Sequence, residues 1–392
     1  MSFSIGLSGL RAVSEELEVI SQNIANVNTA GYKSSRAEFA ALYGGDKPSG
    51  VEVNNVSQNF ERDGNVVTSG RTLDLAISGS GFFQLKDNGQ NVYTRAGLFQ
   101  KNSDNYIVNA AGLKLQGYAV DNQNKLLPGA VTDLQVSSAS IPAKASTKVD
   151  YVGNLKADAS IISATFDPAD ATTYNYSQSG SIYDSLGVEH TLTQYFTKTG
   201  ANAWTANYYV DGAAVQTQAL TFNTDGTLAT PATAVSLSLT PAGANAMTVA
   251  LNISDMSQYA SDFSVSRNQS DGYTAGDMTG VQIESDGSLM AVYSNGQTLL
   301  QGQVVMANFA NPTGLRQGDN TTWYQTFSSG QATIGAPGSG NLGTLSSGSY
   351  EGSNVDLSTE LVNLMTSQRN YQANAKTIST TDKMTQVLFN SF

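Results

Sequence analysis

Residues 353–392 read SNVDLSTELVNLMTSQRNYQANAKTISTTDKMTQVLFNSF, and their pattern decides the fold. From Asp356 to the end there is neither proline nor glycine, which predicts one long helix that Asn354 or Asp356 can cap. Alternating steps of four and three form a heptad row along this helix: Leu357, Leu361, Leu364, Gln368, Tyr371, Ala375 and Ile378. Because an isolated helix with one narrow apolar row is marginal in water, this helix needs a partner.

A matching row occurs at the other end of the chain, on a helix expected from about Ile5 to Val27. It consists of Leu10, Val13, Leu17, Ile20, Ile24 and Val27. Burial at ~1.5–3 kcal/mol per side chain offsets a backbone ordering cost of ~1–2 kcal/mol per residue only if something covers the row. Two interpretations remain open: a helix pair that closes one folded domain, or terminal helices that coil with neighbouring copies in an assembly.

Composition excludes several classes of function. The 392 residues suffice for two or three domains, and only 13% of them are charged, compared with ~25% in ordinary soluble proteins. The net charge of −12 argues against nucleic acid and against anionic membrane surfaces as partners. The absence of cysteine excludes thiolate catalysis, cysteine-ligated metals and disulfides.

Neither the first twenty residues nor the uncharged stretch at 226–254 predicts insertion into a membrane. The first twenty residues include Arg11 and three glutamates, so they do not form a secretory signal peptide. Residues 226–254 carry no charge, but Pro231 and Pro241 interrupt them and Ser and Thr alternate with Val and Leu. This stretch therefore predicts paired strands rather than a membrane span.

The remaining chain reads as strands, which gives a mainly β protein with α-helical termini. Asn28 and Gly31 can end the first helix, and an extended connector with one or two strands follows. Strand and turn signals over 73–120 resume over 270–310, and they flank a Thr- and Ser-rich all-β insert. We therefore expect three nested parts: a helical and connector layer (1–69 plus 351–392), an inner all-β domain (70–145 plus 268–350) and an inserted outer all-β domain (146–267).

No motif predicts an enzyme, and we expect no catalytic, cofactor-binding or metal-ligating residue. His190 is the only histidine, and as a general base it would need a partner and a pocket. The run GSGNLG at 338–343 matches a dinucleotide fingerprint but lies in a Gly- and Ser-rich segment without a following apolar helix. The Asp-Gly turns at Asp225, Asp271 and Asp286 each offer one carboxylate, which is too few for Ca²⁺.

Several motifs resemble the bacterial flagellar rod and hook family. Residues 8–39 contain a helix that ends in the family's turn. This turn is matched by Ala25, Asn26, Thr29, Gly31, Tyr32 and Lys33. Residues 69–85 and 93–118 resemble its next two motifs, and residues 303–315 and 353–378 resemble its C-terminal ones. One departure is Asp104-Asn105-Tyr106, where the family more often has an Asp-Gly turn.

The resemblance implies a structural subunit of a helical homopolymer in which the two heptad rows are assembly surfaces. Length and the central insert favour the hook branch, a flexible curved tube that acts as a universal joint and transmits motor torque. The implied partners are further copies of the chain, the rod, hook cap and hook–filament junction proteins, and the type III export apparatus, without a cleaved signal peptide. The alternatives are a distal rod component, or a secreted β-domain binding protein or adhesin.

Overall fold

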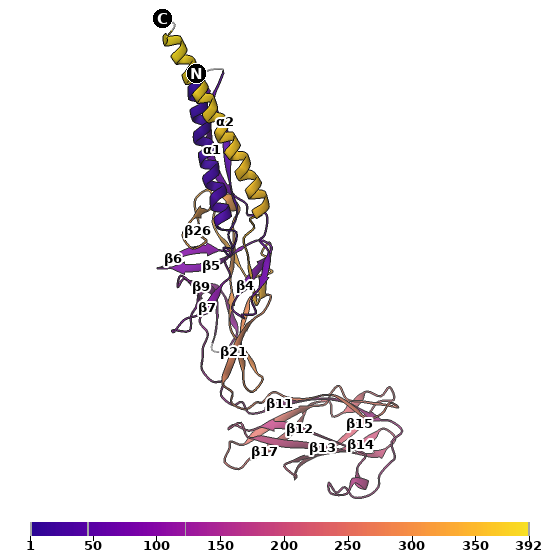
Figure 1. Ribbon diagram of the computed structural model, residues 1–392. Coiled ribbons are helices and arrows are strands. Elements are labelled where there is room, and N and C mark those ends of the chain that lie inside the picture. The colour runs from indigo at the N-terminus through magenta and orange to yellow at the C-terminus, as the bar shows by residue number, and fades with distance from the viewer. Residues whose placement is uncertain (1, 45–46, 122, 391–392) are drawn as a thin grey trace. The chain divides into compact units, whose positions relative to one another are not determined.

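The structure is a computed structural model that describes residues 2–44, 47–121 and 123–390. The chain folds into two compact units. The helix-bearing unit comprises residues 1–138, 280–292 and 298–392, and the inserted unit comprises 139–279 and 293–297. The chain thus leaves the first unit after Ser138 and returns to it at Gly280. The mainly β fold with helical termini is confirmed (Figure 1).

Two helices form the ends of the helix-bearing unit, α1 (Ser2–Ala25) and α2 (Leu357–Asn390). They lie side by side in Figure 1, and α1 also packs against a long antiparallel pair, β1 (Ser35–Gly44) and β2 (Lys47–Gln58). Ala12 and Val19 on α1 are buried. The connector predicted after the first helix therefore contains two strands, which give α1 a second packing surface.

A large sheet forms the body of this unit, with strand order β21-β22-β23-β9-β5-β6-β26-β25 and five further strands paired beside this path. Asn88 and Gly89 both have positive φ in the β5–β6 hairpin, as the Asn-Gly signal predicts. The strands of this sheet are β5 (Phe82–Asp87), β6 (Gln90–Thr94), β7 (Phe99–Lys101), β8 (Ile107–Asn109), β9 (Lys114–Val120), β10 (Leu126–Asp133), β21 (Met278–Ile283), β22 (Ser288–Tyr293), β23 (Thr298–Val304), β24 (Met306–Asn308), β25 (Arg316–Gln317), β26 (Thr322–Tyr324) and β27 (Thr333–Gly335).

Two small sheets join the early and late parts of the chain within this unit. The first pairs β4 (Leu75–Ser78) with β28 (Thr344–Ser347), and the second pairs β3 (Val66–Thr68) with β29 (Ser349–Glu351). An aromatic core includes Phe82, Tyr93 and Trp323, whose rings meet edge to face with their neighbours. The short 3₁₀ helix η2 (Pro312–Gly314) precedes β25 along the chain. These pairings bring the start of α2 back to the turn that ends α1.

The inserted unit is a two-sheet sandwich around one core. The first sheet has the order β12-β13-β14-β15-β16; the second has the order β17-β18-β11-β19, with β20 on β11. The buried side chains of both sheets form a single cluster that includes Trp204 and Leu237. The elements are β11 (Lys148–Lys156), η1 (Ala171–Thr173), β12 (Tyr176–Tyr183), β13 (Glu189–Gly200), β14 (Ala203–Val210), β15 (Ala213–Phe222), β16 (Leu228–Thr230), β17 (Val235–Leu239), β18 (Met247–Asn252), β19 (Ser257–Tyr259) and β20 (Ser264–Ser270).

The uncharged stretch at 226–254 forms strands β16, β17 and β18, as its alternating pattern predicts. Val235, Leu237 and Leu239 on β17 are buried, and the serines between them are exposed. No helix within the described residues is long and apolar enough to cross a membrane.

Candidate assembly site: the terminal helix pair and its foot

The helices α1 and α2 pair in antiparallel orientation. The side chain of Ser367 donates a hydrogen bond to Glu16 (Oγ to Oε2, 2.8 Å), and Asn23 donates one to Glu360 (Nδ2 to Oε1, 3.3 Å). Near the N-terminal end of α1, two glycines allow side chains of α2 to approach closely. A Cβ at Gly6 would lie 3.0 Å from Ile378, and one at Gly9 would lie 3.0 Å from Asn374. The pairing of the terminal helices is therefore confirmed, with a register fixed by four contacts.

The contacts between the helices coincide only in part with the apolar rows seen in the sequence: Ile378 of the second row faces Gly6, whereas the hydrogen-bonding residues lie outside both rows. On α1, Gly9, Glu16 and Asn23 are seven residues apart, and they face Asn374, Ser367 and Glu360, which are also seven apart. Glycine permits close approach of the two backbones, and hydrogen bonds satisfy the polar side chains at the seam. The seam thus combines polar side chains with Ile378, and on α2 part of the apolar row remains exposed.

The exposed fractions show which row residues the pair leaves uncovered. Leu357, Leu361 and Tyr371 are 43%, 45% and 41% exposed. Gln368 is also exposed, whereas Leu364, Ala375 and Ile378 are half-buried. On α1, Val13 and Ile20 are buried, and Leu10, Leu17, Ile24 and Val27 are half-buried. Within one chain, α2 therefore keeps much of its apolar row open to solvent.

The first helix ends at Ala25 rather than at Val27, which corrects the expected boundary. The side chain of Asn26 donates to the carbonyl of Gln22 (2.9 Å) and accepts from the hydroxyl of Thr29 (3.0 Å). An asparagine that bonds its own backbone and the following turn competes with helix continuation. Val27 consequently lies in the turn, and Asn26 and Thr29 act together there, as their place in the family motif implies.

Gly31 and Tyr32 connect this turn to distant parts of the unit. Gly31 has φ +68°, its N–H donates to the carbonyl of Glu351 (2.8 Å), and an added Cβ would overlap the backbone nitrogen of Ala96. The hydroxyl of Tyr32 donates to Asn23 (3.2 Å), and burial raises the pKa of Tyr32. The turn is thus held in place by one position that only glycine fits and by one buried tyrosine.

Asn23 is a buried hub that the sequence analysis did not single out. Its Oδ1 accepts hydrogen bonds from Tyr32 and from the N–H of Ser35, and its Nδ2 donates to the carbonyl of Ser35 and to Glu360. Both polar atoms of the Asn23 side chain therefore have hydrogen-bond partners. Asn23 thereby joins α1, the turn, the start of β1 and α2. Burial of Glu360 beside Asn23 raises the pKa of that carboxyl group.

Below the hub lies a buried ion cluster that links four separate segments. Glu351 at the end of β29 accepts from Lys33 (Nζ to Oε1, 2.8 Å), from the N–H of Gly64 (2.9 Å) and from Arg95 (Nη1 to Oε2, 3.2 Å). Lys33, Arg95 and Glu351 are almost fully buried, and Asp63, which is partly exposed, lies 3.5 Å from both cations. Of these four residues, the family turn motif singled out only Lys33.

The start of α2 is attached to the same foot. Asn354 is buried, accepts from the N–H of Ser34 (2.7 Å) and donates to the carbonyls of residues 59 and 62. Of the two expected caps, Asp356 is the one used: its Oδ1 accepts from the N–H of Thr359 (3.0 Å), and this bond lowers the pKa of Asp356. We call the contacts of Lys33, Asp63, Arg95, Glu351 and Asn354 the helix foot.

The histidine and the glycine-rich run considered in the sequence lie in different units. His190 in the inserted unit contacts two carboxylates, Asp211 (Nδ1 to Oδ2, 2.7 Å) and Asp184 (Nε2 to Oδ2, 3.5 Å). The hydrogen bond to Asp211 raises the pKa of His190. The run at 338–343 forms turns that lead into β28. Among the residues that the structure describes, no group of His, Cys, Asp and Glu side chains is arranged to hold a metal ion.

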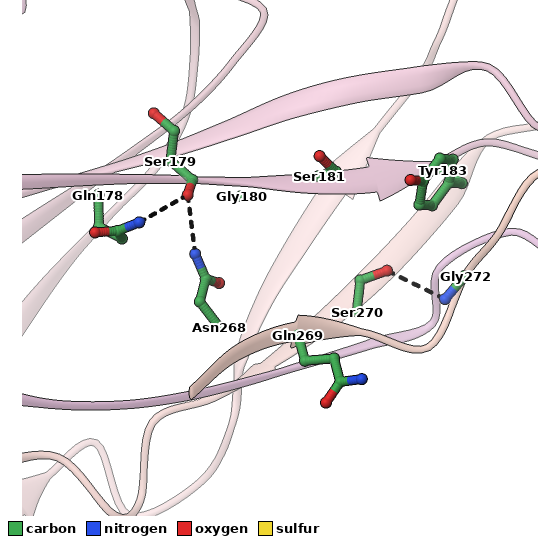
Figure 2. A pocket seen from close by; sticks show the side chains of 9 residues that line it. All are labelled: Gln178, Ser179, Gly180, Ser181, Tyr183, Asn268, Gln269, Ser270 and Gly272. Carbon is green, nitrogen blue, oxygen red and sulfur yellow. Dashed lines mark hydrogen bonds between the residues drawn. The ribbon is translucent and has the colours of Figure 1, made fainter. Parts of the chain in front are cut away.

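A shallow polar groove in the inserted unit lies between β12 and β20 (Figure 2). Asn268 donates across it to the carbonyl of Ser179 (3.1 Å), and the hydroxyl of Ser270 accepts from the N–H of Gly272 (3.1 Å). Its walls are neutral amide, hydroxyl and glycine groups, without a charged or nucleophilic cluster. The groove therefore supplies neither an acid–base pair nor an ion site.

Comparison with known proteins first defines the class. Family models match in the order expected for an axial flagellar protein: "Flagella basal body rod protein" at residues 3–33, "Flagellar hook protein FlgE/F/G D1 domain" at 76–183, "Flagellar basal body protein FlaE D2 domain" at 154–273, and "Flagellar basal body rod FlgEFG protein C-terminal" at 346–391. The first and last of these contain the paired helices, and the two middle ones cover strands of both units. The fold and the helix pair are thus those of the flagellar rod and hook class.

Relatives over the full length then identify the particular family. The flagellar hook protein FlgE of Escherichia coli (strain K12) is 40% identical over 402 residues, and that of Salmonella typhimurium is 41% identical over 404 residues, with all of each chain covered. The protein of Brucella suis biovar 1 is 32% identical and covers 98% of this chain and 97% of its own. This chain belongs to the flagellar hook protein family.

A solved structure supports the fold alone. The flagellar hook protein FlgE2 of Helicobacter pylori superposes with a TM-score of 0.54 at 15% identity, covering 71% of this chain and 98% of its own.

Proposed function

We propose that this chain is the structural subunit of the bacterial flagellar hook, which polymerises into a flexible, curved tube and transmits torque from the rod to the filament. The observation that carries the proposal is the full-length similarity to hook proteins of several bacteria. A structural role also agrees with a family that is named for its place in the flagellum rather than for a reaction.

The exposed side of the helix pair supports assembly through the termini. Val362 and Met365 are 56% and 51% exposed, and they lie on α2 together with the exposed members of its apolar row. Apolar surface gains ~25 cal/mol per Å² when it is removed from water, so neighbouring copies that cover these side chains stabilise the tube. The proposed assembly residues are those of the two rows, Leu10, Val13, Leu17, Ile20, Ile24, Val27, Leu357, Leu361, Leu364, Gln368, Tyr371, Ala375 and Ile378.

The helix foot bears on how such a tube bends. Buried ion pairs and hydrogen bonds tie the end of α1 and the start of α2 to β29 and to the segment around Asp63. Breaking such contacts costs several kcal/mol, so the helix pair moves together with the strands at its foot. We infer that the tube bends by adjusting contacts between copies, where a surface with few charges offers few strong ion pairs.

The proposed surroundings follow from the same role. The subunit polymerises with itself and contacts the rod at one end of the tube and hook cap and hook–filament junction proteins at the other. It reaches the outside of the cell through the flagellar export apparatus. Within the helix-bearing unit, we propose that residues 1–69 plus 351–392 form the innermost layer and that the β-domains surround it.

Electron microscopy of the purified full-length chain under salting-out conditions tests this function. A matched sample lacks residues 1–30 and 355–392, which removes both helices and keeps the strands. Curved tubes from the full chain alone support the hook function and assign assembly to the termini. Straight tubes indicate a rod component, and full-length chains that remain monomeric under all conditions favour a secreted binding protein.

A further inference from the structure

Phe327 stands out from the helix-bearing unit as an isolated aromatic side chain. Its exposed fraction is 105%, so it contacts nothing else in its own chain. It lies in the loop between β26 and β27, which we call the 325–331 loop. An aromatic side chain held fully in water forgoes ~1.5–3 kcal/mol of burial free energy. A residue of this kind at a loop tip therefore calls for an explanation outside the folded chain.

The backbone beneath Phe327 is firmly held. The hydroxyl of Thr326 donates to the carbonyl of Gly314 (2.5 Å), and the fully buried Ser329 donates its hydroxyl to the carbonyl of Thr326 (2.9 Å). Asn311 donates its side-chain amide to the carbonyl of Ser328 (3.0 Å). These bonds fasten the loop to the segment around η2 on both sides of Phe327, so the backbone that carries the ring is held in a defined position.

A fixed, exposed aromatic residue is typical of a binding hot spot. Aromatic side chains dominate interface energies, and a loop that is already ordered loses little conformational entropy when it binds. The ordered loop thus lowers the entropic cost of binding. The exposed ring of Phe327 does not contribute to the stability of its own chain. Phe327 has the properties of an anchor for a partner surface.

Charge indicates what the partner is. The chain has a net charge of −12, so two copies repel each other over most of their surfaces. Residues 320–350, which include the 325–331 loop, carry no Lys, Arg, Asp, Glu or His. A second copy of this chain can approach the neutral 325–331 loop without placing like charges together. A strongly basic partner, by contrast, would find no acidic groups there.

We propose that Phe327 is an assembly anchor that inserts into a different surface of a neighbouring copy of this chain. The inference rests on the proposed function, because it assumes that copies of the chain form a polymer. A contact between an anchor and a different surface is heterologous, and repetition of such contacts builds an open helical polymer when the rotation between copies does not close a ring. The contact also lies apart in the chain from the terminal rows, so it forms a second, independent assembly element.

The test compares the critical concentration for polymerisation of the full-length chain with that of Phe327→Ala. We expect the critical concentration to rise at least ~10-fold, which corresponds to ~1.4 kcal/mol per contact. The thermal midpoint of the monomer should stay unchanged, since the side chain has no intramolecular contact. The matched control is Ser328→Ala, which alters the neighbouring exposed side chain and should leave both values unchanged.

Because the chain contains no cysteine, Phe327→Cys also provides a unique label. We expect maleimide to modify this cysteine in the monomer and not in the polymer. An unchanged critical concentration for Phe327→Ala, or equal labelling in monomer and polymer, overturns the anchor while the proposed function stands. Failure of the unmodified chain to polymerise at all overturns both.

Discussion

Neutralising Glu351 should destabilise the helix-bearing unit strongly. Glu351→Gln keeps the shape of the side chain but removes the buried charge that faces Lys33 (2.8 Å) and Arg95 (3.2 Å). The remaining carboxylate, Asp63, is 3.5 Å from both cations and partly exposed. Removing one partner of a buried ion pair costs ~3–5 kcal/mol, and here two cations lose their partner, so we expect a loss in the upper half of that range. With a slope of ~2–3 kcal/mol/M, the urea midpoint should fall by ~1.3–2.5 M.

The two tryptophans make this loss measurable in each unit separately. Trp323 lies in the helix-bearing unit and Trp204 in the inserted unit. In a Trp204→Phe background, fluorescence should show the Glu351→Gln shift, whereas Trp204 in a Trp323→Phe background should show none. Glu61→Gln makes the same chemical change at an exposed carboxylate and should stay within ~0.5 kcal/mol. A loss below ~1 kcal/mol for Glu351→Gln would refute the view that the helix foot depends on this charge.

Three further changes test other parts of the account. Gly31→Ala should cost roughly 2–4 kcal/mol in urea unfolding, because φ is +68° and the methyl group overlaps Ala96; an unchanged midpoint would contradict this reading. The raised pKa of His190, caused chiefly by its hydrogen bond to Asp211, stabilises the inserted unit fully below about pH 6.5. This contribution should be lost as pH rises through the raised folded-state pKa, and His190→Gln should abolish that slope in pH-dependent thermal melts. Leu361→Ser should leave the monomer within ~0.5 kcal/mol by urea unfolding but raise the critical concentration for polymerisation; unaltered assembly would exclude this row residue from the interface.

Local sequence patterns were sufficient for much of the secondary structure. The long run without proline or glycine after Asp356 forms α2, and the Asn88-Gly89 turn joins two strands where the pattern places them. Each of these signals acts within a few residues, because helix propagation and hairpin turns are local events.

The seam between the helices was not predictable from the apolar pattern. The row through Leu357 and Leu361 is the more apolar, yet α1 faces Glu360 and Ser367 instead. The choice depends on Asn23, whose four hydrogen bonds need the folded turn, and on close approach at Gly9. The contacts of Asn23 with Glu360 and of Gly9 with Asn374 join residues hundreds of positions apart, so no local spacing reveals them.

The ion cluster of the helix foot has the same origin. Lys33 came from the family turn, but Arg95 and Glu351 lie in unrelated segments that only the small sheets bring together. In the sequence, a charged residue that will be buried beside a strand cannot be distinguished from one that will be exposed to solvent. A signal existed only in the low overall charge, since a chain with few charges has fewer candidates for a buried cluster.

The central claim is that this chain builds the curved tube of the flagellar hook. The most direct measurement is electron cryo-microscopy of hook–basal bodies isolated from cells in which this chain is the only hook-type gene product. The account predicts a curved tube made of this chain, with α1 and α2 of neighbouring copies packed together along their exposed rows and no tube in cells that express Leu357→Ser with Leu361→Ser. A straight shaft built from this chain, or hooks that form without it, would contradict the account.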